Sequence, residues 1–324
     1  MKKNYLLSIL IIFLSSCTVS NIDTISVYVP EEGGISFTKL TDESKETIVN
    51  PNVNFYGGRL SWWANPLISL SPDGQNLAFC SYKNEARNIM VKATNNTSMS
   101  TQRTFRKNVN DVCYSPDGET ICFSEVNGAY SYLYFTNAKQ GTIIQQISGN
   151  NVADYGPSFS KDGKKLFFAR ESQGTNSIWS YEKETNLFTN YCNGMSPSPI
   201  NDEEFLCIRT NKNGFTDVWL INYIKGTESI ILSTEGQSFA TASLSPDNKW
   251  ILVTGTTKSR GEKTRNNLDI YVVKRDGSQL TQLTYHQGHD ASPIWSKDGK
   301  YIYFLSQRGT EKGEWNIWKM NFNL

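Results

Sequence analysis

The sequence predicts an all-β protein, a six-bladed β-propeller whose blades are four-stranded antiparallel sheets. Three observations predict this fold class. A turn of the form Ser-Pro-Asp-Gly or Ser-Lys-Asp-Gly recurs along the chain, apolar strand-like runs flank each turn, and no helical periodicity is found in the 324 residues. Repeats of roughly 20 to 50 residues are typical of propellers and other repeat architectures, so the repeat decides the fold class.

The six copies have the pattern of two strands joined by a tight turn. Gly supplies the positive φ that the turn needs, and the Asp side chain bonds to its own backbone. Successive copies are 44, 45, 39, 46 and 51 residues apart, and the fourth copy is degenerate. The turn residues are Asp73, Asp117, Asp162, Asn201, Asp247 and Asp298, in "SLSPDGQNLAF", "CYSPDGETICF", "SFSKDGKKLFF", "SPINDEEFLCI", "SLSPDNKWILV" and "IWSKDGKYIYF".

Each copy continues with a third strand and, in most copies, a fourth. Third strands are predicted in "NIMVKAT", "YLYFTNA", "SIWSYEK", "DVWLINY", "DIYVVKR" and "NIWKMNF". Fourth strands are clear in "GTIIQQIS", "TESIILS" and "SQLTQLT". The sixth copy stops at Leu324 after its third strand, whereas "ISFTKLT" from Ile35 is similar to "SQLTQLT". We therefore expect the N-terminal strand to complete the last blade and to close the ring without free edges.

The N-terminal segment "MKKNYLLSILIIFLSSC" has two lysines, a short apolar run and small residues, which is the pattern of a secretory signal. The apolar run is too short to span a bilayer. "LSSC" resembles the lipobox of bacterial lipoproteins, which implies lipidation of Cys17. Thr18 resembles the residue found in lipoproteins sent to the outer membrane. The expected organisation is a signal peptide over residues 1–16, a lipidated tether over 17–34 and the propeller over 35–324.

Charge and cysteine usage narrow the range of partners. Without residues 1–16 the chain has 30 basic and 31 acidic residues, a net charge of −1, which gives no reason to expect nucleic acid. We expect a monomer that touches the membrane only through its lipid anchor. The other cysteines lack metal-ligand spacing and are expected to be small structural side chains, although the sequence assigns no disulfide. They are Cys80, Cys113, Cys122, Cys192 and Cys207.

The "SPDG" turn, followed by an apolar strand and then "IW" or "IY", resembles the repeat of TolB-like β-propellers, relatives of WD repeats that are common in bacterial envelopes. The resemblance covers Ile35 to Leu324. It implies the fold but no single function, because similar blades serve as adaptors, in prolyl-oligopeptidase-type peptidases and in oligogalacturonate lyases. TolB itself has an additional domain before its propeller, whereas here about 17 residues separate Cys17 from Ile35. This difference argues against TolB itself.

Candidate binding residues lie on the face of the disc opposite the "SPDG" turns, which we call the loop face. In a four-strand meander this face carries the blade-to-blade connections, and loops on a rigid scaffold are where binding residues concentrate. "NPNVNFYGGRLSWWANP" leads into the first blade. Its Trp62 and Trp63 are suited to stacking on a sugar or packing against a protein, although either side chain could instead fill a blade interface. Arg59 is a weaker candidate beside them.

Two aspartates and two arginines recur at matching places of the third and sixth blades. Asp154 in "DYGP" and Asp290 in "DASP" precede the inner strands, where such an aspartate caps a turn or orients a ligand at the channel mouth. Arg170 and Arg308 follow the second strands, where a guanidinium reaches the channel mouth, bonds a carboxylate or remains solvated. All four are candidate binding residues.

The two histidines, His286 and His289, stand beside Asp290 in "HQGHD". These three side chains suit zinc or manganese, but the spacing is weakly specific. The pectic lyases that resemble this chain hold their metal with histidines from several blades, and a third histidine does not exist here. A G-x-S-x-G elbow is also absent from the sequence. We therefore predict no catalytic residue, metal or cofactor, and we count both histidines as binding residues.

The sequence thus predicts a non-catalytic envelope lipoprotein whose propeller binds a protein or glycan partner through the loop face. The alternative is a metal-dependent enzyme acting on oligosaccharides, similar to oligogalacturonate lyases, that would use His286 and His289.

Overall fold

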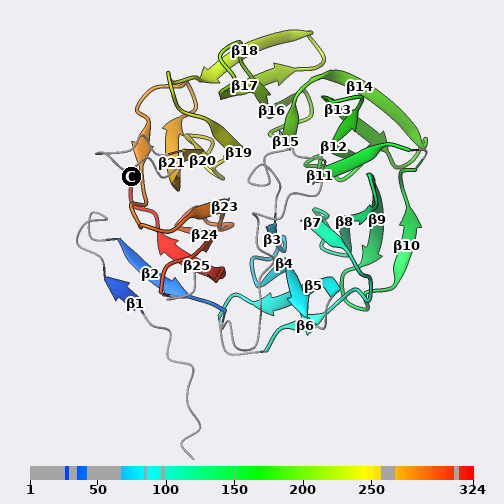
Figure 1. Ribbon diagram of the computed structural model, residues 1–324, viewed down its shortest axis with the longest axis horizontal. Coiled ribbons are helices and arrows are strands. Elements are labelled where there is room, and N and C mark those ends of the chain that lie inside the picture. The colour runs from blue at the N-terminus through cyan, green and yellow to red at the C-terminus, as the bar shows by residue number, and fades with distance from the viewer. Residues whose placement is uncertain are drawn as a thin grey trace, which may run out of the picture.

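The computed structural model describes residues 26–28, 35–41, 67–83, 86–95, 99–149, 151–256, 267–309 and 314–324. Within these ranges the chain forms strands, arranged as six blades around a central axis (Figure 1). Each blade is an antiparallel meander, and its first strand lies next to the axis. The predicted fold class is confirmed. No helix in the described part of the chain is long and apolar enough to cross a lipid bilayer.

The strands of the first three blades follow the chain in order from the axis outward. Blade 1 consists of β3 (Ile68–Leu70), β4 (Asn76–Lys83), β5 (Ala86–Ala93) and β6 (Thr101–Gln102). Blade 2 consists of β7 (Val109–Tyr114), β8 (Thr120–Asn127), β9 (Tyr130–Asn137) and β10 (Ile143–Gln146). Blade 3 consists of β11 (Ala153–Phe159), β12 (Lys165–Ser172), β13 (Thr175–Glu182) and β14 (Leu187–Asn193).

The other three blades repeat this arrangement. Blade 4 consists of β15 (Met195–Pro199), β16 (Glu204–Thr210), β17 (Thr216–Asn222) and β18 (Thr227–Leu232). Blade 5 consists of β19 (Phe239–Leu244), β20 (Trp250–Thr256), β21 (Leu268–Lys274) and β22 (Thr281–Gln282). Blade 6 consists of β23 (Asp290–Trp295), β24 (Tyr301–Ser306), β25 (Asn316–Asn321) and β2 (Ser36–Lys39), and β1 (Ser26–Tyr28) extends it outward.

The two ends of the chain meet in blade 6, as the similarity of "ISFTKLT" to a fourth strand predicts. β2 pairs antiparallel with β25, and Phe37 lies opposite Met320. β1 in turn pairs with β2 and forms the outer edge of the sheet. β1 lies within residues 17–34, so part of the predicted tether is a strand of this sheet.

The turns have the predicted chemistry, as blade 3 shows. The Ser160 hydroxyl donates to the Asp162 carboxylate over 2.6 Å, and the backbone N–H of Lys164 donates to the same oxygen over 3.0 Å. Gly163 has a φ of 73°, which suits a residue without a Cβ. In the degenerate fourth copy, Asn201 takes over the acceptor role and receives two backbone N–H groups at 2.8 Å. The turn therefore tolerates the loss of Asp.

Five of the inner strands contain a β-bulge that the sequence did not predict. In blade 3 the pairing of β11 with β12 shifts register between Tyr155 and Ser158, and equivalent shifts interrupt β7, β15, β19 and β23. A bulge bends its strand and re-aims the side chains beside it. The bulge residues with positive φ are Gly156 (60°), Ser196 (51°), Thr241 (50°) and Ser292 (50°).

The hydrophobic core is divided among the contacts between neighbouring blades. One cluster joins blades 1 and 2 around Phe123, another joins blades 2 and 3 around Phe135, and a third joins blades 6 and 1 around Phe79. Burial of such rings is the main stabilising contribution in a β-protein of this kind. Cys80, Cys122 and Cys207 are fully buried, and Cys113 and Cys192 are half-buried; all five are free thiols.

Candidate functional site at the propeller axis

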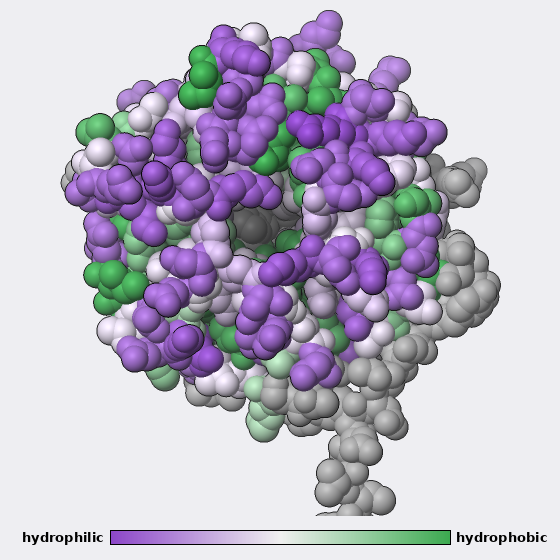
Figure 2. Space-filling model, turned by 180° about the vertical axis from the view of Figure 1, so that it is seen from behind, coloured by the Kyte–Doolittle hydropathy of each residue, from purple (hydrophilic) through white to green (hydrophobic). Residues whose placement is uncertain are grey.

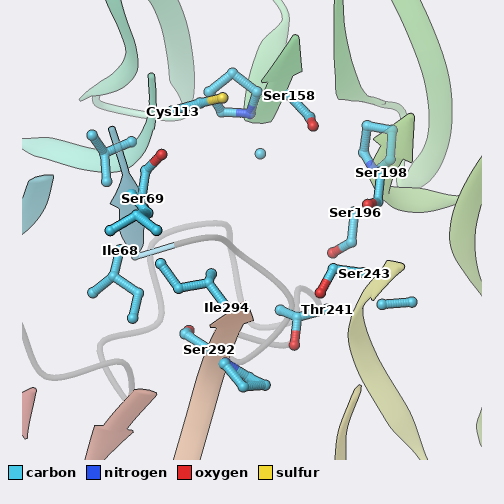
Figure 3. A pocket seen from close by; sticks show the side chains of 17 residues that line it. Ile68, Ser69, Cys113, Ser158, Ser196, Ser198, Thr241, Ser243, Ser292 and Ile294 are labelled. Carbon is cyan, nitrogen blue, oxygen red and sulfur yellow. The ribbon is translucent and has the colours of Figure 1, made fainter. Parts of the chain in front are cut away.

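The inner strands of all six blades surround a cavity of about 200 Å³ on the propeller axis, which we call the channel pocket. Figure 2 shows a hollow at the centre of one face of the disc, surrounded by hydrophilic side chains. Figure 3 shows the side chains around the cavity, which come from β3, β7, β11, β15, β19 and β23. The pocket is thus shared by all the repeats.

Two tiers of side chains line the pocket at fixed distances from the "SPDG" turns. The tier nearer the turns lies two residues before the turn serine or its equivalent, and it consists of Ser69, Cys113, Ser158, Ser198, Ser243 and Ile294. The tier nearer the loop face contains the bulge residues Gly156, Ser196, Thr241 and Ser292. Among the described residues that line the pocket, seven carry a hydroxyl group and none carries a charge.

The hydroxyl groups differ in how they are bonded. Ser69 Oγ accepts the backbone N–H of Tyr114 over 3.0 Å and so ties blade 1 to blade 2. Thr241 and Thr254 share a hydrogen bond of 2.9 Å between their hydroxyls. Ser243 Oγ is buried and makes no hydrogen bond to any residue that the structure describes. The Ser243 hydroxyl is therefore a candidate hydrogen-bonding group of the pocket.

A buried carboxylate, Asp111, supports the wall of the pocket from behind. Its Oδ2 accepts the backbone N–H of Gly156 and the hydroxyl of Ser124, each over 2.8 Å, and its Oδ1 accepts the amide of Asn110 over 3.0 Å. The side chain is fully buried, and this desolvation raises the pKa of Asp111 from 3.8 to about 6. Asp111 of blade 2 therefore holds the bulge of blade 3.

Asp154 and Arg170, both predicted binding residues, form an ion pair across blade 3. The two residues lie directly opposite each other on β11 and β12, and Arg170 Nε and Nη2 donate to the two carboxylate oxygens over 2.7 and 2.8 Å. The guanidinium carbon also lies 4.6 Å from the centre of the Trp179 ring. Burial raises the pKa of Asp154, against the hydrogen bond from Arg170. The pair holds the loop-face end of the inner strand.

Asp290 and Arg308 form a more deeply buried pair in blade 6. Arg308 Nη2 donates to Asp290 Oδ2 over 2.6 Å, and its Nε donates to the Ser306 hydroxyl over 2.9 Å. The guanidinium carbon lies 3.9 Å from the centre of the Phe37 ring, which belongs to the N-terminal strand β2. Arg308 is 4% exposed, so its charge faces protein and not solvent. Blades 3 and 6 lie on opposite sides of the ring, so this pair is separate from Asp154 and Arg170.

His286 and His289 precede Asp290 in the chain, and the Nδ1 atom of each ring accepts a hydrogen bond from a backbone N–H group. His286 Nδ1 accepts the N–H of Gly288 over 2.9 Å, and His289 Nδ1 accepts the N–H of Leu268 over 3.2 Å. Burial lowers the pKa of His289, although the charge of Asp290 opposes this change. The rings of His289 and Trp315 stack with an interplanar angle of 9°. Both histidines thus fix the connection between blades 5 and 6.

The alternative metal site at His286, His289 and Asp290 does not form. In the ranges given above, no three His, Cys, Asp or Glu side chains are placed to share a metal ion. The reason is local: Asp290 turns toward Arg308, and both histidines turn toward backbone N–H groups.

The remaining candidates lie outside the described residues. These are the lipidation site Cys17 and the loop residues Arg59, Trp62 and Trp63. In contrast, the channel pocket was missed by the sequence reasoning although a signal for it is present. The first letters of the six repeat copies are S, C, S, S, S and I, and they are the pocket tier nearer the turns.

The ring of blades and the axial pocket define the chain as a β-propeller protein. Residues 59–186 match the TolB beta propeller domain family, which agrees with the resemblance seen in the repeats. The chain carries a TolB-like β-propeller. Among curated proteins, none matches the sequence.

Solved structures with similar folds include proteins of different function. TolB from Acinetobacter baumannii is 16% identical with a TM-score of 0.60, and the match covers 77% of this chain and 64% of TolB. A protein from Agrobacterium tumefaciens described as a TolB has the same identity and TM-score, with 80% and 90% covered. Oligogalacturonate lyase from Vibrio parahaemolyticus is 13% identical, with a TM-score of 0.60 and 90% and 94% covered. These similarities concern the fold.

Proposed function

We propose that this protein is a non-catalytic binding propeller of the bacterial cell envelope, held in the outer membrane by lipid on Cys17, which binds a protein or glycan through its loop face. In this proposal the channel pocket receives an uncharged polar group of the partner, and Trp62, Trp63 and Arg59 make further contacts with the partner. The TolB-like fold supports a place in the envelope. The segment "LSSC" supports the lipid anchor.

The observation that carries the proposal is the composition of the pocket. Hydroxyl groups from several blades converge on one space, and Ser243 Oγ has no partner among the described residues. A volume of about 200 Å³ is smaller than the roughly 300–1,000 Å³ of most small-molecule sites. Such a space suits one protruding group of a larger partner, whose remaining contacts lie on the surrounding face.

The ion pairs and histidines of the loop face take a supporting role in this proposal. Asp154 with Arg170, and Asp290 with Arg308, neutralise each other inside their blades. His286 and His289 hold the connection between blades 5 and 6 through backbone hydrogen bonds. These contacts hold the described ends of the blades in one conformation, which lowers the entropic cost of binding a partner.

A cross-linking pull-down from intact envelopes, read by mass spectrometry, tests the proposal. The native lipoprotein is compared with a Trp62→Ala, Trp63→Ala double variant and with Ser198→Leu, which fills the pocket. Lys161→Leu is the matched control, because it adds the same side chain to an exposed turn on the other face. We expect one defined partner with the native and control forms and at least a roughly tenfold loss with the other two, since about 1.4 kcal/mol of lost binding gives that factor.

The pull-down and an activity assay together separate binding from catalysis. Retention of the partner by both the double variant and Ser198→Leu would contradict a site at the loop face and channel. Manganese-dependent cleavage of oligogalacturonate by the native protein, abolished by His289→Ala, would replace the binding proposal with the enzyme alternative.

A further inference from the structure

Two thiols, Cys192 and Cys207, meet where blade 3 packs on blade 4. Cys192 lies on β14, the outer strand of blade 3, and Cys207 lies on β16, the second strand of blade 4. Both side chains belong to the core cluster shared by these blades. A Cβ atom placed on Gly194 would lie 3.4 Å from Cys207 Sγ, so that sulfur points toward the connection that follows Cys192.

The surroundings of the two sulfurs are asymmetric. Cys207 is fully buried, whereas Cys192 is half-buried and within reach of solvent. Cys207 and the guanidinium of Arg209 are neighbours of the Cys192 thiol, and both act on its acidity. One sulfur is therefore accessible and beside a positive charge, and the other is a protected neighbour.

Arg209 is held in place for this contact. Its Nη1 and Nη2 donate to the two carboxylate oxygens of Glu228 over 2.7 and 2.9 Å. Its Nε is buried and has no hydrogen-bond partner among the residues that the structure describes. A buried N–H without an acceptor costs free energy, and a negative charge on the nearby sulfur of Cys192 would offset this cost. The geometry thus favours a thiolate at Cys192.

The acid–base properties of the pair agree with the geometry. The hydrogen bond from Cys207, and then that from Arg209, lower the pKa of Cys192 from 9.0 to about 7, against the effect of burial. The same contact with Cys192, together with burial, raises the pKa of Cys207 well above its usual value. A low-pKa thiolate beside a protonated thiol is the arrangement found in reactive dithiols.

We propose that Cys192 and Cys207 form a thiol–disulfide exchange site, which reacts with a disulfide oxidant and closes a covalent link between blades 3 and 4. The oxidant is a disulfide R–S–S–R, either a low-molecular-weight disulfide or that of an oxidoreductase. This site is separate from the channel pocket and does not depend on the binding proposal.

The reaction balances as a two-electron exchange. The Cys192 thiolate attacks one sulfur of R–S–S–R, the S–S bond breaks and R–S⁻ leaves. Cys207 then loses its proton, its sulfur attacks Cys192 in the mixed disulfide, and the second R–S⁻ leaves. The two protein thiols are oxidised to one disulfide, and the oxidant is reduced to two molecules of R–SH, which carry the two protons.

The pH dependence of alkylation tests the reactive thiol in the full chain without any substitution. Reduced protein is treated with iodoacetamide over a range of pH, and each cysteine peptide is quantified by mass spectrometry. We expect half-maximal modification of Cys192 near pH 7. Cys113 is the internal control, because burial raises its pKa to about 11. Half-maximal modification of Cys192 at or above the usual thiol value of about 8.5 would overturn the proposal.

Variants of the neighbours show whether the contacts cause the reactivity. Cys207→Ala and Arg209→Gln should each move the midpoint of Cys192 upward, toward about 8.5. Cys207→Ser should move it less, because the serine hydroxyl still donates a hydrogen bond. Unchanged midpoints in Cys207→Ala and Arg209→Gln would show that the contacts do not act on Cys192.

Oxidation with glutathione disulfide tests the product. We expect a cross-linked peptide of Cys192 and Cys207 from the native chain, and a glutathione adduct on Cys192 in Cys207→Ser. Cys122→Ser is the matched control and should behave as the native chain does. Cys113 and Cys122 lie opposite each other on β7 and β8. A link between these two cysteines in place of the expected peptide would overturn the proposal. The absence of any link in the native chain would overturn it too.

Discussion

Replacement of Asp111 by asparagine should change how the stability of this protein depends on pH. Asp111 is the buried carboxyl that holds the Gly156 bulge, and burial raises its pKa from 3.8 to about 6. Between these pH values the folded protein keeps a proton that the unfolded chain has released. The contribution of Asp111 is therefore fully present below about pH 4 and is lost as the pH rises through about 6.

The size of the effect follows from the pKa difference of about two units. At about 1.36 kcal/mol per unit, ionisation of Asp111 lowers the free energy of unfolding by about 3 kcal/mol between pH 4 and pH 7. An asparagine side chain at this position cannot ionise, so D111N lacks this loss. We expect the stability of the native chain, minus that of D111N, to fall by about 3 kcal/mol over this range.

Urea unfolding at a series of pH values and constant ionic strength measures this difference. The comparison of two proteins at each pH cancels the titration of the other groups. Asp162→Asn is the control of opposite sign, because the hydrogen bond from Ser160 lowers the pKa of Asp162, and its contribution is lost as the pH falls. A native-minus-D111N difference that is flat, or that rises with pH, would refute the reasoning, because it would show that folding does not raise the pKa of Asp111.

Three further substitutions test the packing of the blades, each by the unfolding midpoint in urea or heat. Arg308→Met should cost about 3–5 kcal/mol, because Asp290 is left buried without its partner; a loss smaller than about 1 kcal/mol would contradict this. Gly141→Ala should cost several kcal/mol, because Gly141 has a φ of 74° and the new Cβ would lie 1.8 Å from the Arg103 carbonyl oxygen. Native-like stability of this variant would contradict the prediction. Arg170→Lys should cost about 1–2 kcal/mol through loss of the bidentate geometry, and no loss would show that charge alone suffices.

The fold could be predicted because its signals are local. Turn chemistry and flanking apolar runs occupy about ten consecutive residues, and their recurrence marks every blade. Even the degenerate copy forms its turn, since Asn201 accepts the backbone N–H groups that Asp accepts elsewhere. The pairing of β2 with β25 was also predictable, because the missing fourth strand of the last copy leaves an edge that a similar strand can fill.

The site was harder to predict because it depends on register. Asp154 and Arg170 were recognised as charged residues near the channel mouth, but their separation in sequence does not show that β11 and β12 place them directly opposite each other. The bulges create a similar difficulty. At Thr241 and Ser292 the backbone adopts positive φ without glycine, so composition gives no sign that the strand turns these hydroxyls toward the axis.

The pairing of charges within blades explains why the pocket lining carries hydroxyl groups and no charged side chain among the described residues. Arg170 and Arg308 direct their hydrogen bonds to Asp154 and Asp290, and aromatic rings cover both guanidinium groups. A charge pointing into the axis would face six strands at close range, and its desolvation would need a partner there. Hydroxyls avoid this cost while still offering donors and acceptors. The carboxylate of Asp111 lies behind the lining, where it fixes the backbone of the Gly156 bulge, and the described lining itself is uncharged.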